Sequence, residues 1–169
     1  MKILKFVLLS TLLLTITLVI VFSQKDIPLN KLKEKYTNSY SSFIDIGGTN
    51  VHYRDEGIYN DSIPIILIHG TGSSLHAYDI WSKSLKKTNR VIRMDLPAFG
   101  LTGPFLNKDY SILNYTTFLK EFLNSLDITQ CILVGNSLGG EIAWRFAVQE
   151  PVIAKKLILI DPGGYPVKS

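Results

Sequence analysis

The chain has 169 residues, of which 46% are hydrophobic and 19% are charged, so it carries enough apolar material for one globular core and does not have the composition of a disordered protein. Its formal net charge is +4, but the lysines are scattered and no aromatic and basic residues are interleaved, so no nucleic-acid partner is expected. The lone cysteine, Cys131, lies in an apolar run, which favours a small buried side chain over a ligand or nucleophile.

The first 23 residues are an apolar leader. Residues 6–22 carry no charge and follow Lys2 and Lys5. A run of about 20 uncharged residues can cross a bilayer as a helix, whereas the apolar part of a signal peptide usually has about 7 to 15. Run length therefore favours a membrane anchor with the following domain outside the cytoplasm. The alternative is a secreted protein, cleaved after Ser23.

A polar, lysine-rich segment follows at residues 24–41. It contains Pro28 and is expected to be a juxtamembrane spacer with a short helix around residues 29–36. The folded domain is expected to occupy residues 42–169.

Strands and helices alternate through that domain. Continuous apolar runs bounded by turn residues predict strands buried in a parallel sheet, and apolar residues at three- and four-residue spacing predict amphipathic helices. Two β-prone runs joined by Gly47-Gly48-Thr49 predict an antiparallel hairpin at the start. The predicted class is α/β, a mostly parallel sheet with an N-terminal antiparallel hairpin and flanking helices, preceded by one membrane helix. The predicted strands are 42–46, 50–55, 64–68, 90–96, 131–134 and 157–160, and the predicted helices are 78–87, 111–126 and 141–150.

The stretch Gly135-Asn136-Ser137-Leu138-Gly139-Gly140 lies between a predicted strand and a predicted helix. A GxSxG turn at such a junction exposes the serine hydroxyl above the sheet, where a nucleophile is needed. The glycines two residues before and after Ser137 fit this interpretation, because strand and helix come so close that a Cβ would collide. Ser137 itself is expected to be strained. The alternative is that a small residue simply fits a tight turn.

Three motifs together resemble the α/β-hydrolase fold superfamily, over about Phe43 to Pro166. They are His69-Gly70-Thr71-Gly72, Asp95-Leu96-Pro97-Ala98-Phe99-Gly100 and the GxSxG turn. The resemblance implies a serine nucleophile that attacks an ester or similar carbonyl and forms an acyl-enzyme. A serine at this position argues against the related epoxide hydrolases and haloalkane dehalogenases, which use a carboxylate there. The sequence GNSxGG resembles the elbows of carbon–carbon bond hydrolases, and esterases also carry it.

The same resemblance implies the donors that would hold a tetrahedral oxyanion. The backbone N–H of Leu138, after the nucleophile, is the first, and that of Thr71 is the second, with Gly72 as its alternative. His69 is expected to shape its loop rather than act as a base, because the family places its catalytic histidine near the C-terminus.

The chain departs from the family after Ser137. The triad order is serine, acid, histidine, but all three histidines of this chain precede the serine. Asp161 is a candidate acid, although Asp-Pro-Gly-Gly also fits a simple turn. The simplest interpretation is a serine hydrolase truncated after its sixth strand, with that strand at an exposed parallel edge. The alternative is a membrane-tethered, non-catalytic binding module that keeps the nucleophile turn.

No cofactor is expected. No His, Cys, Asp or Glu cluster has metal-ligand spacing, and Gly163-Gly164 lacks the following helix or lysine of a nucleotide site. The expected partners are a small-molecule carbonyl substrate and, through the leader, a membrane; the oligomeric state is not indicated. Phe99, Leu101 and Phe105 are candidates for the mouth of the site, with packing on the sheet as the alternative.

Overall fold

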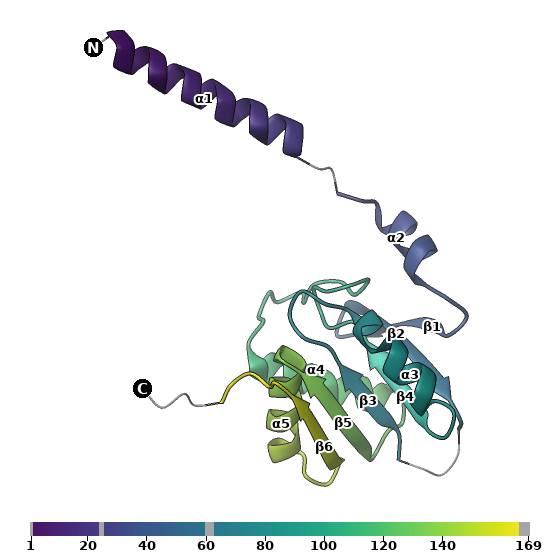
Figure 1. Ribbon diagram of the computed structural model, residues 1–169. Helices are drawn as coiled ribbons and strands as arrows, with labels where there is room; N and C mark the ends of the chain where they lie inside the picture. Colours follow the sequence, from purple (N-terminus) through teal and green to yellow (C-terminus); the bar gives the residue numbers. More distant parts are fainter. Residues whose placement is uncertain (1, 24–25, 60–62, 166–169) are drawn as a thin grey trace. The chain divides into compact units, whose positions relative to one another are not determined.

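A computed structural model describes residues 2–23, 26–59 and 63–165 (Figure 1). The chain divides into two compact units, Met1–Lys35 and Tyr36–Ser169, which are described separately.

The first unit contains the predicted leader helix. Helix α1 (Lys2–Phe22) has 21 residues, and none of its side chains is buried. It is long and apolar enough to cross a membrane, a criterion that a signal sequence also meets. The predicted spacer helix is present as α2 (Leu29–Tyr36).

The second unit is built on one six-stranded sheet with the order β1-β2-β4-β3-β5-β6. β1 and β2 form the predicted antiparallel hairpin, and β2 also pairs antiparallel with β4. The pairings β4-β3, β3-β5 and β5-β6 are parallel, as the alternation of strands and helices predicts. The strands are β1 (Ser41–Ile46), β2 (Thr49–Gly57), β3 (Ile65–Ile68), β4 (Arg90–Met94), β5 (Cys131–Asn136) and β6 (Ala154–Ile160).

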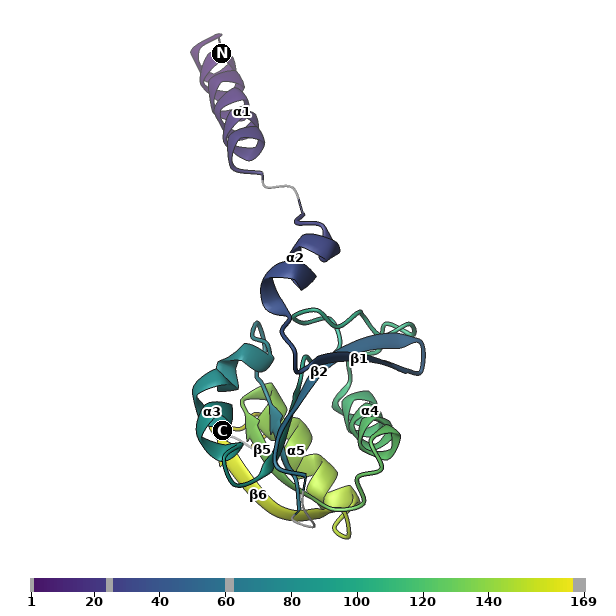
Figure 2. The same cartoon turned by 90° about the vertical axis from the view of Figure 1, so that its right-hand side faces the viewer.

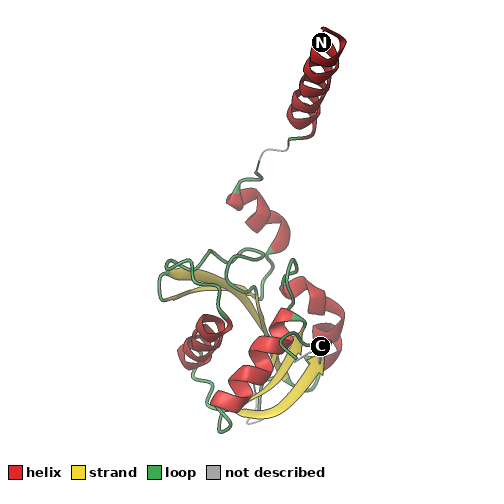
Figure 3. Cartoon of the chain, turned by 90° about the vertical axis from the view of Figure 1, so that its left-hand side faces the viewer, coloured by secondary structure: helices red, strands yellow, loops and turns green. Residues whose placement is uncertain are grey.

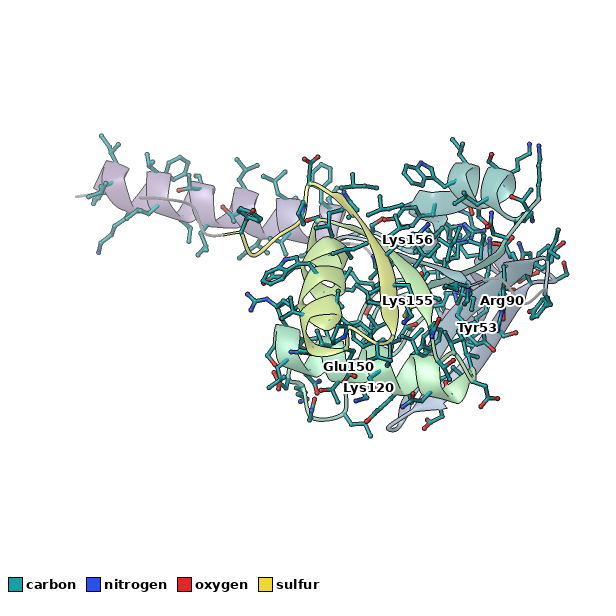
Figure 4. The ribbon with its side chains drawn as sticks, turned by 90° about the horizontal axis from the view of Figure 1, so that it is seen from below. Tyr53, Arg90, Lys120, Glu150, Lys155 and Lys156 are labelled. Atoms are coloured by element: carbon teal, nitrogen blue, oxygen red, sulfur yellow. The ribbon has the colours of Figure 1, made fainter. Side chains whose placement is uncertain are left out.

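Helices cover both faces of the sheet. The views in Figures 2 and 3 place α3 (Asp79–Leu85), which follows the short 3₁₀ helix η1 (Leu75–Tyr78), on one face, and α4 (Ile112–Ser125) with α5 (Leu138–Gln149) on the other. Ser111 is the N-cap of α4, because its hydroxyl accepts the N–H of Asn114 at 3.3 Å. An ion pair between Lys120 and Glu150, labelled in Figure 4, joins α4 to the end of α5.

The main core fills the space between the sheet and the pair α4 and α5. All four residues of β3 are buried, as expected for a central parallel strand. Cys131 is fully buried in this core, which confirms it as a structural apolar residue. Helix faces supply the rest of the packing: the buried apolar side chains of α4 and α5 are Tyr115, Phe118, Leu119, Phe122, Leu123, Ile142, Ala143 and Phe146.

The spacing of Tyr78, Trp81 and Leu85 predicts an apolar stripe on the helix expected at residues 78–87, and this prediction is partly wrong. Tyr78 is buried, but Trp81 is 44% exposed, and Ser82 faces inward instead. The Ser82 hydroxyl donates to the carboxylate of Glu56 at 2.7 Å, and Glu56 also pairs with Arg93 at 2.8 Å. The inner face of α3 covers a buried ion pair rather than a purely apolar surface. A hydroxyl there can hydrogen-bond the buried Glu56 carboxylate, so Ser82 faces inward and the Trp81 indole does not.

β6 forms the exposed parallel edge that the sequence predicts. It pairs only with β5, and Leu157, Ile158 and Leu159 are 37%, 47% and 38% exposed. The register shifts at the start of β6, where Lys155 has no partner residue on β5, and Lys155 and Lys156 (Figure 4) are both exposed. Lysines and bulges are devices that discourage edge-to-edge pairing. They protect the start of β6 and leave its apolar second half open.

Candidate active site

The turn between β5 and α5 holds Ser137 in a strained conformation, as predicted. Its φ and ψ are 49° and −114°, outside the regions that non-glycine residues normally occupy, at a cost of about 1–3 kcal/mol. Backbone hydrogen bonds maintain this geometry. The N–H of Ser137 donates to Ile160 at 3.1 Å, and its carbonyl accepts from Glu141 and Gly163 at 3.0 and 2.9 Å.

Two glycines make the turn sterically possible. A Cβ on Gly135 would lie 2.3 Å from the carbonyl oxygen of Gly139, and a Cβ on Gly139 would lie 2.2 Å from that of Ile68. Both clashes involve backbone atoms, which cannot move aside as a flexible side chain can. These positions therefore require glycine, for the reason that the sequence suggests.

The hydroxyl of Ser137 is available to a ligand. The residue is exposed, and none of the described residues hydrogen-bonds to its Oγ. In particular, each of the three histidines has a partner elsewhere: His52 Nδ1 lies 2.8 Å from Asp95, His69 contacts Gly70, and His76 lies 3.1 Å from Asp79. None of them is placed as a base for Ser137.

Two backbone N–H groups beside Ser137 lack acceptors among the described residues. Leu138 opens α5, and the first N–H groups of a helix point outward with a partial positive charge. Thr71 follows Gly70, and a Cβ on Gly70 would come within 3.0 Å of Ser137 Cβ, so this loop lies against the nucleophile turn. Gly72 is also exposed, with a φ of +69°. The arrangement is compatible with the predicted oxyanion donors.

His69 fixes the loop that carries Thr71. Its ring is buried, Nδ1 donates to the carbonyl of Gly70 at 2.8 Å, and Nε2 accepts the N–H of Leu96 at 3.0 Å. This pattern needs the neutral ring, and burial lowers the pKa of His69, which favours that form. The geometry suits the loop-shaping role expected for His69.

Asp95 is a second anchor for the same loop. Its carboxylate accepts the N–H groups of Leu75 at 2.8 Å and Leu101 at 2.9 Å, as well as the ring of His52. Burial by itself would raise the pKa of Asp95, but these hydrogen bonds outweigh burial and hold the pKa below its usual value. Gly100 completes the arrangement, because a Cβ there would lie 2.2 Å from Asp95 Cγ. The Asp95 motif is visible in the sequence, but its buried partnership with His52 is not.

Asp161 lies directly after β6. It is exposed, has a φ of 42°, and has no hydrogen bond or ion pair with any described residue. The next residues buttress the nucleophile turn: besides the bond from Gly163 to Ser137, Trp144 Nε1 donates to the Gly163 carbonyl at 3.1 Å. This supporting role of the segment after β6 is not evident from the sequence.

An apolar pocket of about 350 Å³ adjoins the nucleophile turn and reaches Thr71 and Leu138. Phe99 lines it, as predicted for the mouth of the site. Leu101 and Phe105 are buried and pack inside the domain, so for these two the packing alternative holds.

Comparisons with known proteins support the same fold. A family model described as alpha/beta hydrolase fold matches residues 63–168. A 2-hydroxy-6-oxo-2,4-heptadienoate hydrolase from Pseudomonas putida is 31% identical over 121 residues, which cover 70% of this chain and 43% of that protein. Human epoxide hydrolase 4 is 30% identical over 115 residues, covering 68% of this chain and 32% of that protein.

Among solved structures, a meta-cleavage product hydrolase from Pseudomonas fluorescens superposes with a TM-score of 0.69 at 28% identity, covering 75% of this chain and 47% of that chain. The relatives are thus hydrolases of differing chemistry, and this chain spans less than half the length of each.

Proposed function

The chain belongs to the α/β-hydrolase fold family, and on that premise we propose that Ser137 is the nucleophile of a serine hydrolase acting on an ester or similar carbonyl substrate. The observation that carries the proposal is an exposed, strained serine next to two backbone N–H groups. These N–H groups, of Leu138 and Thr71, donate to no acceptor among the described residues. Strained backbone maintained by several hydrogen bonds is typical of functional sites.

In the proposed reaction, Ser137 Oγ attacks the substrate carbonyl carbon. The carbonyl oxygen becomes an oxyanion that accepts hydrogen bonds from Leu138 and Thr71, each worth about 3–4 kcal/mol in such sites. The leaving group departs with a proton and leaves an acyl group on Ser137, which water then removes. The N–H of Leu138 stabilises the oxyanion more than an amide outside a helix would, because it lies at the positive end of α5.

The proton on Ser137 needs an acceptor, and the three histidines are occupied elsewhere. We propose that the base and its acid partner lie in additional polypeptide of a longer protein, in line with relatives more than twice as long as the matched region. Asp161 stays a second candidate for the acid. Residues 1–169 alone are then expected to turn over substrate poorly, because a serine hydroxyl without a base is a weak nucleophile.

The bond that is cleaved can be an ester or an activated carbon–carbon bond. The resemblance of the Gly135 to Gly140 turn to carbon–carbon bond hydrolases, and the likeness to two such proteins, support the second possibility. A serine at position 137 also supports carbonyl chemistry over epoxide opening, although a relative is named an epoxide hydrolase. We further propose that α1 tethers the domain to a membrane, with the site outside the cytoplasm.

The experiment compares p-nitrophenyl ester hydrolysis by the protein and by a Ser137→Ala variant, both for residues 1–169 and for any longer product of the same reading frame. The proposal expects Ser137-dependent turnover from the longer product and close to none from residues 1–169. Robust Ser137-dependent turnover by residues 1–169 would contradict the proposal that the base lies in additional polypeptide.

A second candidate function is a membrane-tethered binding module that keeps the nucleophile turn without catalysis. The observation that favours it is the missing hydrogen bond to Ser137 Oγ among the described residues. A stop codon directly after Ser169, together with ligand binding but no Ser137-dependent turnover, would support this candidate over the enzyme.

A further inference from the structure

The pocket beside Ser137 has a distinctive lining. Its walls come from the loop after β3, the loop after β4 and the start of α4, together with the first residue of α5. None of the lining side chains in the described part of the chain is charged. They are Thr71, Ala98, Phe99, Tyr110, Tyr115 and Leu138.

Two aromatic rings form a firm wall of this pocket. Tyr115 is 3% exposed, and its hydroxyl donates to the carbonyl of Pro97 at 3.2 Å. Burial raises the pKa of Tyr115 to about 12, so its phenol stays neutral at physiological pH. The Tyr110 ring lies 6.4 Å from that of Tyr115, and both rings pack on Phe105. Tyr110 is itself 42% exposed, so it lies where a ligand can reach it.

The two residues whose N–H groups would hold the oxyanion, Thr71 and Leu138, both line this pocket. When Leu138 and Thr71 hold the carbonyl oxygen, the carbon substituent of the carbonyl begins only two bonds from that oxygen. This substituent must therefore lie near the pocket. A second pocket, of about 240 Å³ and lined by Trp81 and Ile160 among others, includes neither donor.

We infer that the pocket formed by Phe99, Tyr110 and Tyr115 receives the carbon substituent of the substrate carbonyl, and that this substituent is apolar and about as large as one aromatic ring on a short linker. The inference rests on the proposed function. A cavity of about 150 Å³ holds a benzene molecule, and ligand pockets usually measure about 300–1,000 Å³, so 350 Å³ suits a small group. A charged substituent is disfavoured, because the lining is mainly apolar and includes no charged side chain to pair with it.

The test is noncovalent, so it does not depend on catalysis. The full chain is prepared with ¹³C-labelled tyrosine rings, and NMR follows Tyr110, Tyr115 and the distant Tyr40 during titration with phenylacetone. Tyr110→Phe, Tyr115→Phe and Tyr40→Phe assign the three signals. Saturable shifts of Tyr110 and Tyr115, with Tyr40 unmoved, are expected. The charged analogue 4-(2-oxopropyl)benzoate is expected to bind at least about tenfold more weakly.

Variants show whether the ring itself forms the binding wall. Tyr110→Ala is expected to weaken phenylacetone binding by about fivefold, while Tyr110→Phe keeps the ring and the affinity. Tyr40→Ala is the matched control, since Tyr40 is 45% exposed, and it should have no effect. Unmoved Tyr110 and Tyr115 signals, or equal affinity for the charged analogue, would overturn the inference. Ser137→Ala should leave this binding intact, whereas it abolishes acylation, so the two proposals fail in different measurements.

Discussion

The Nε2 atom of His69 lies 3.0 Å from the backbone nitrogen of Leu96 and accepts its N–H, while Nδ1 of the same ring donates to Gly70. One neutral imidazole thereby joins the loop after β3 to the loop after β4. Because Thr71 follows Gly70 directly, the position of one predicted oxyanion donor depends on the protonation state of a buried ring.

The first prediction concerns pH. Burial holds the pKa of His69 below 6.5 in the folded state, so the unfolded chain takes up this proton first as the pH falls. The contribution of neutral His69 to the stability of the folded state is complete above about pH 6.5 and is lost as the pH falls below this value. We expect the temperature of the unfolding midpoint to decrease as the pH is lowered from 7 to 5. The decrease should be smaller in His69→Gln, because the glutamine amide can bond both Gly70 and Leu96 without titrating. Identical pH profiles would contradict this role.

The second prediction concerns Asp95. In Asp95→Asn an amide group replaces one carboxylate oxygen and faces N–H donors, which leaves buried groups unpaired. The expected loss in the free energy of unfolding is about 3–5 kcal/mol, measured by urea denaturation. Asp109→Asn, at an exposed carboxylate that caps a turn, is the control and should lose less than about 1 kcal/mol. Equal losses in the two variants would argue against Asp95 as an anchor.

The third prediction concerns steric limits at the nucleophile turn. Gly139→Ala would place a Cβ 2.2 Å from the carbonyl oxygen of Ile68, so it should cost about 3 kcal/mol or prevent folding. Gly103→Ala is a matched control, because the nearest atom to its Cβ would be the Asn50 nitrogen at 4.0 Å. A stable Gly139→Ala protein would mean that strand and helix are not as close as described.

Much of this fold follows from local pattern. Continuous or alternating apolar runs predict the strands, of which β3 is buried throughout, and apolar residues at three- and four-residue spacing predict α4 and α5. The glycines around Ser137 are predictable because the GxSxG spacing is a known motif, although only the constraint on Gly135 is local, while that on Gly139 comes from Ile68 on β3.

What the sequence does not reveal depends on contacts distant in the chain. His52 and Asp95 are 43 residues apart, and nothing local to either shows that they pair. Ser82, on α3, faces inward because Glu56, on the distant strand β2, accepts its hydroxyl. The pocket beside Ser137 likewise combines four separate segments, so its apolar lining emerges only once they are assembled.

The fourth prediction concerns the exposed edge. β6 pairs with β5 on one side, and no described strand pairs with its outer edge. This edge includes the exposed Leu157, Ile158 and Leu159, and the lysines of β6 lie only at its start. The second unit, residues 36–169, should self-associate at micromolar concentration, and Ile158→Lys should reduce this in sedimentation velocity. Val148→Lys, at a residue that is 74% exposed on α5, is the control. If both lysine variants behave alike, net charge rather than the edge controls association.

The central claim is that Ser137 is a nucleophile, and covalent labelling tests it most directly. A product of the reading frame that includes the proposed base is incubated with a fluorophosphonate, and the modified residue is located by peptide mass spectrometry. Ser41 is an internal comparison, because its Oγ already contacts His52 and accepts from Asn38 and Arg54. We expect label on Ser137, none on Ser41, and none in Ser137→Ala. An unlabelled Ser137 in a folded protein whose tyrosine pocket binds phenylacetone would contradict it.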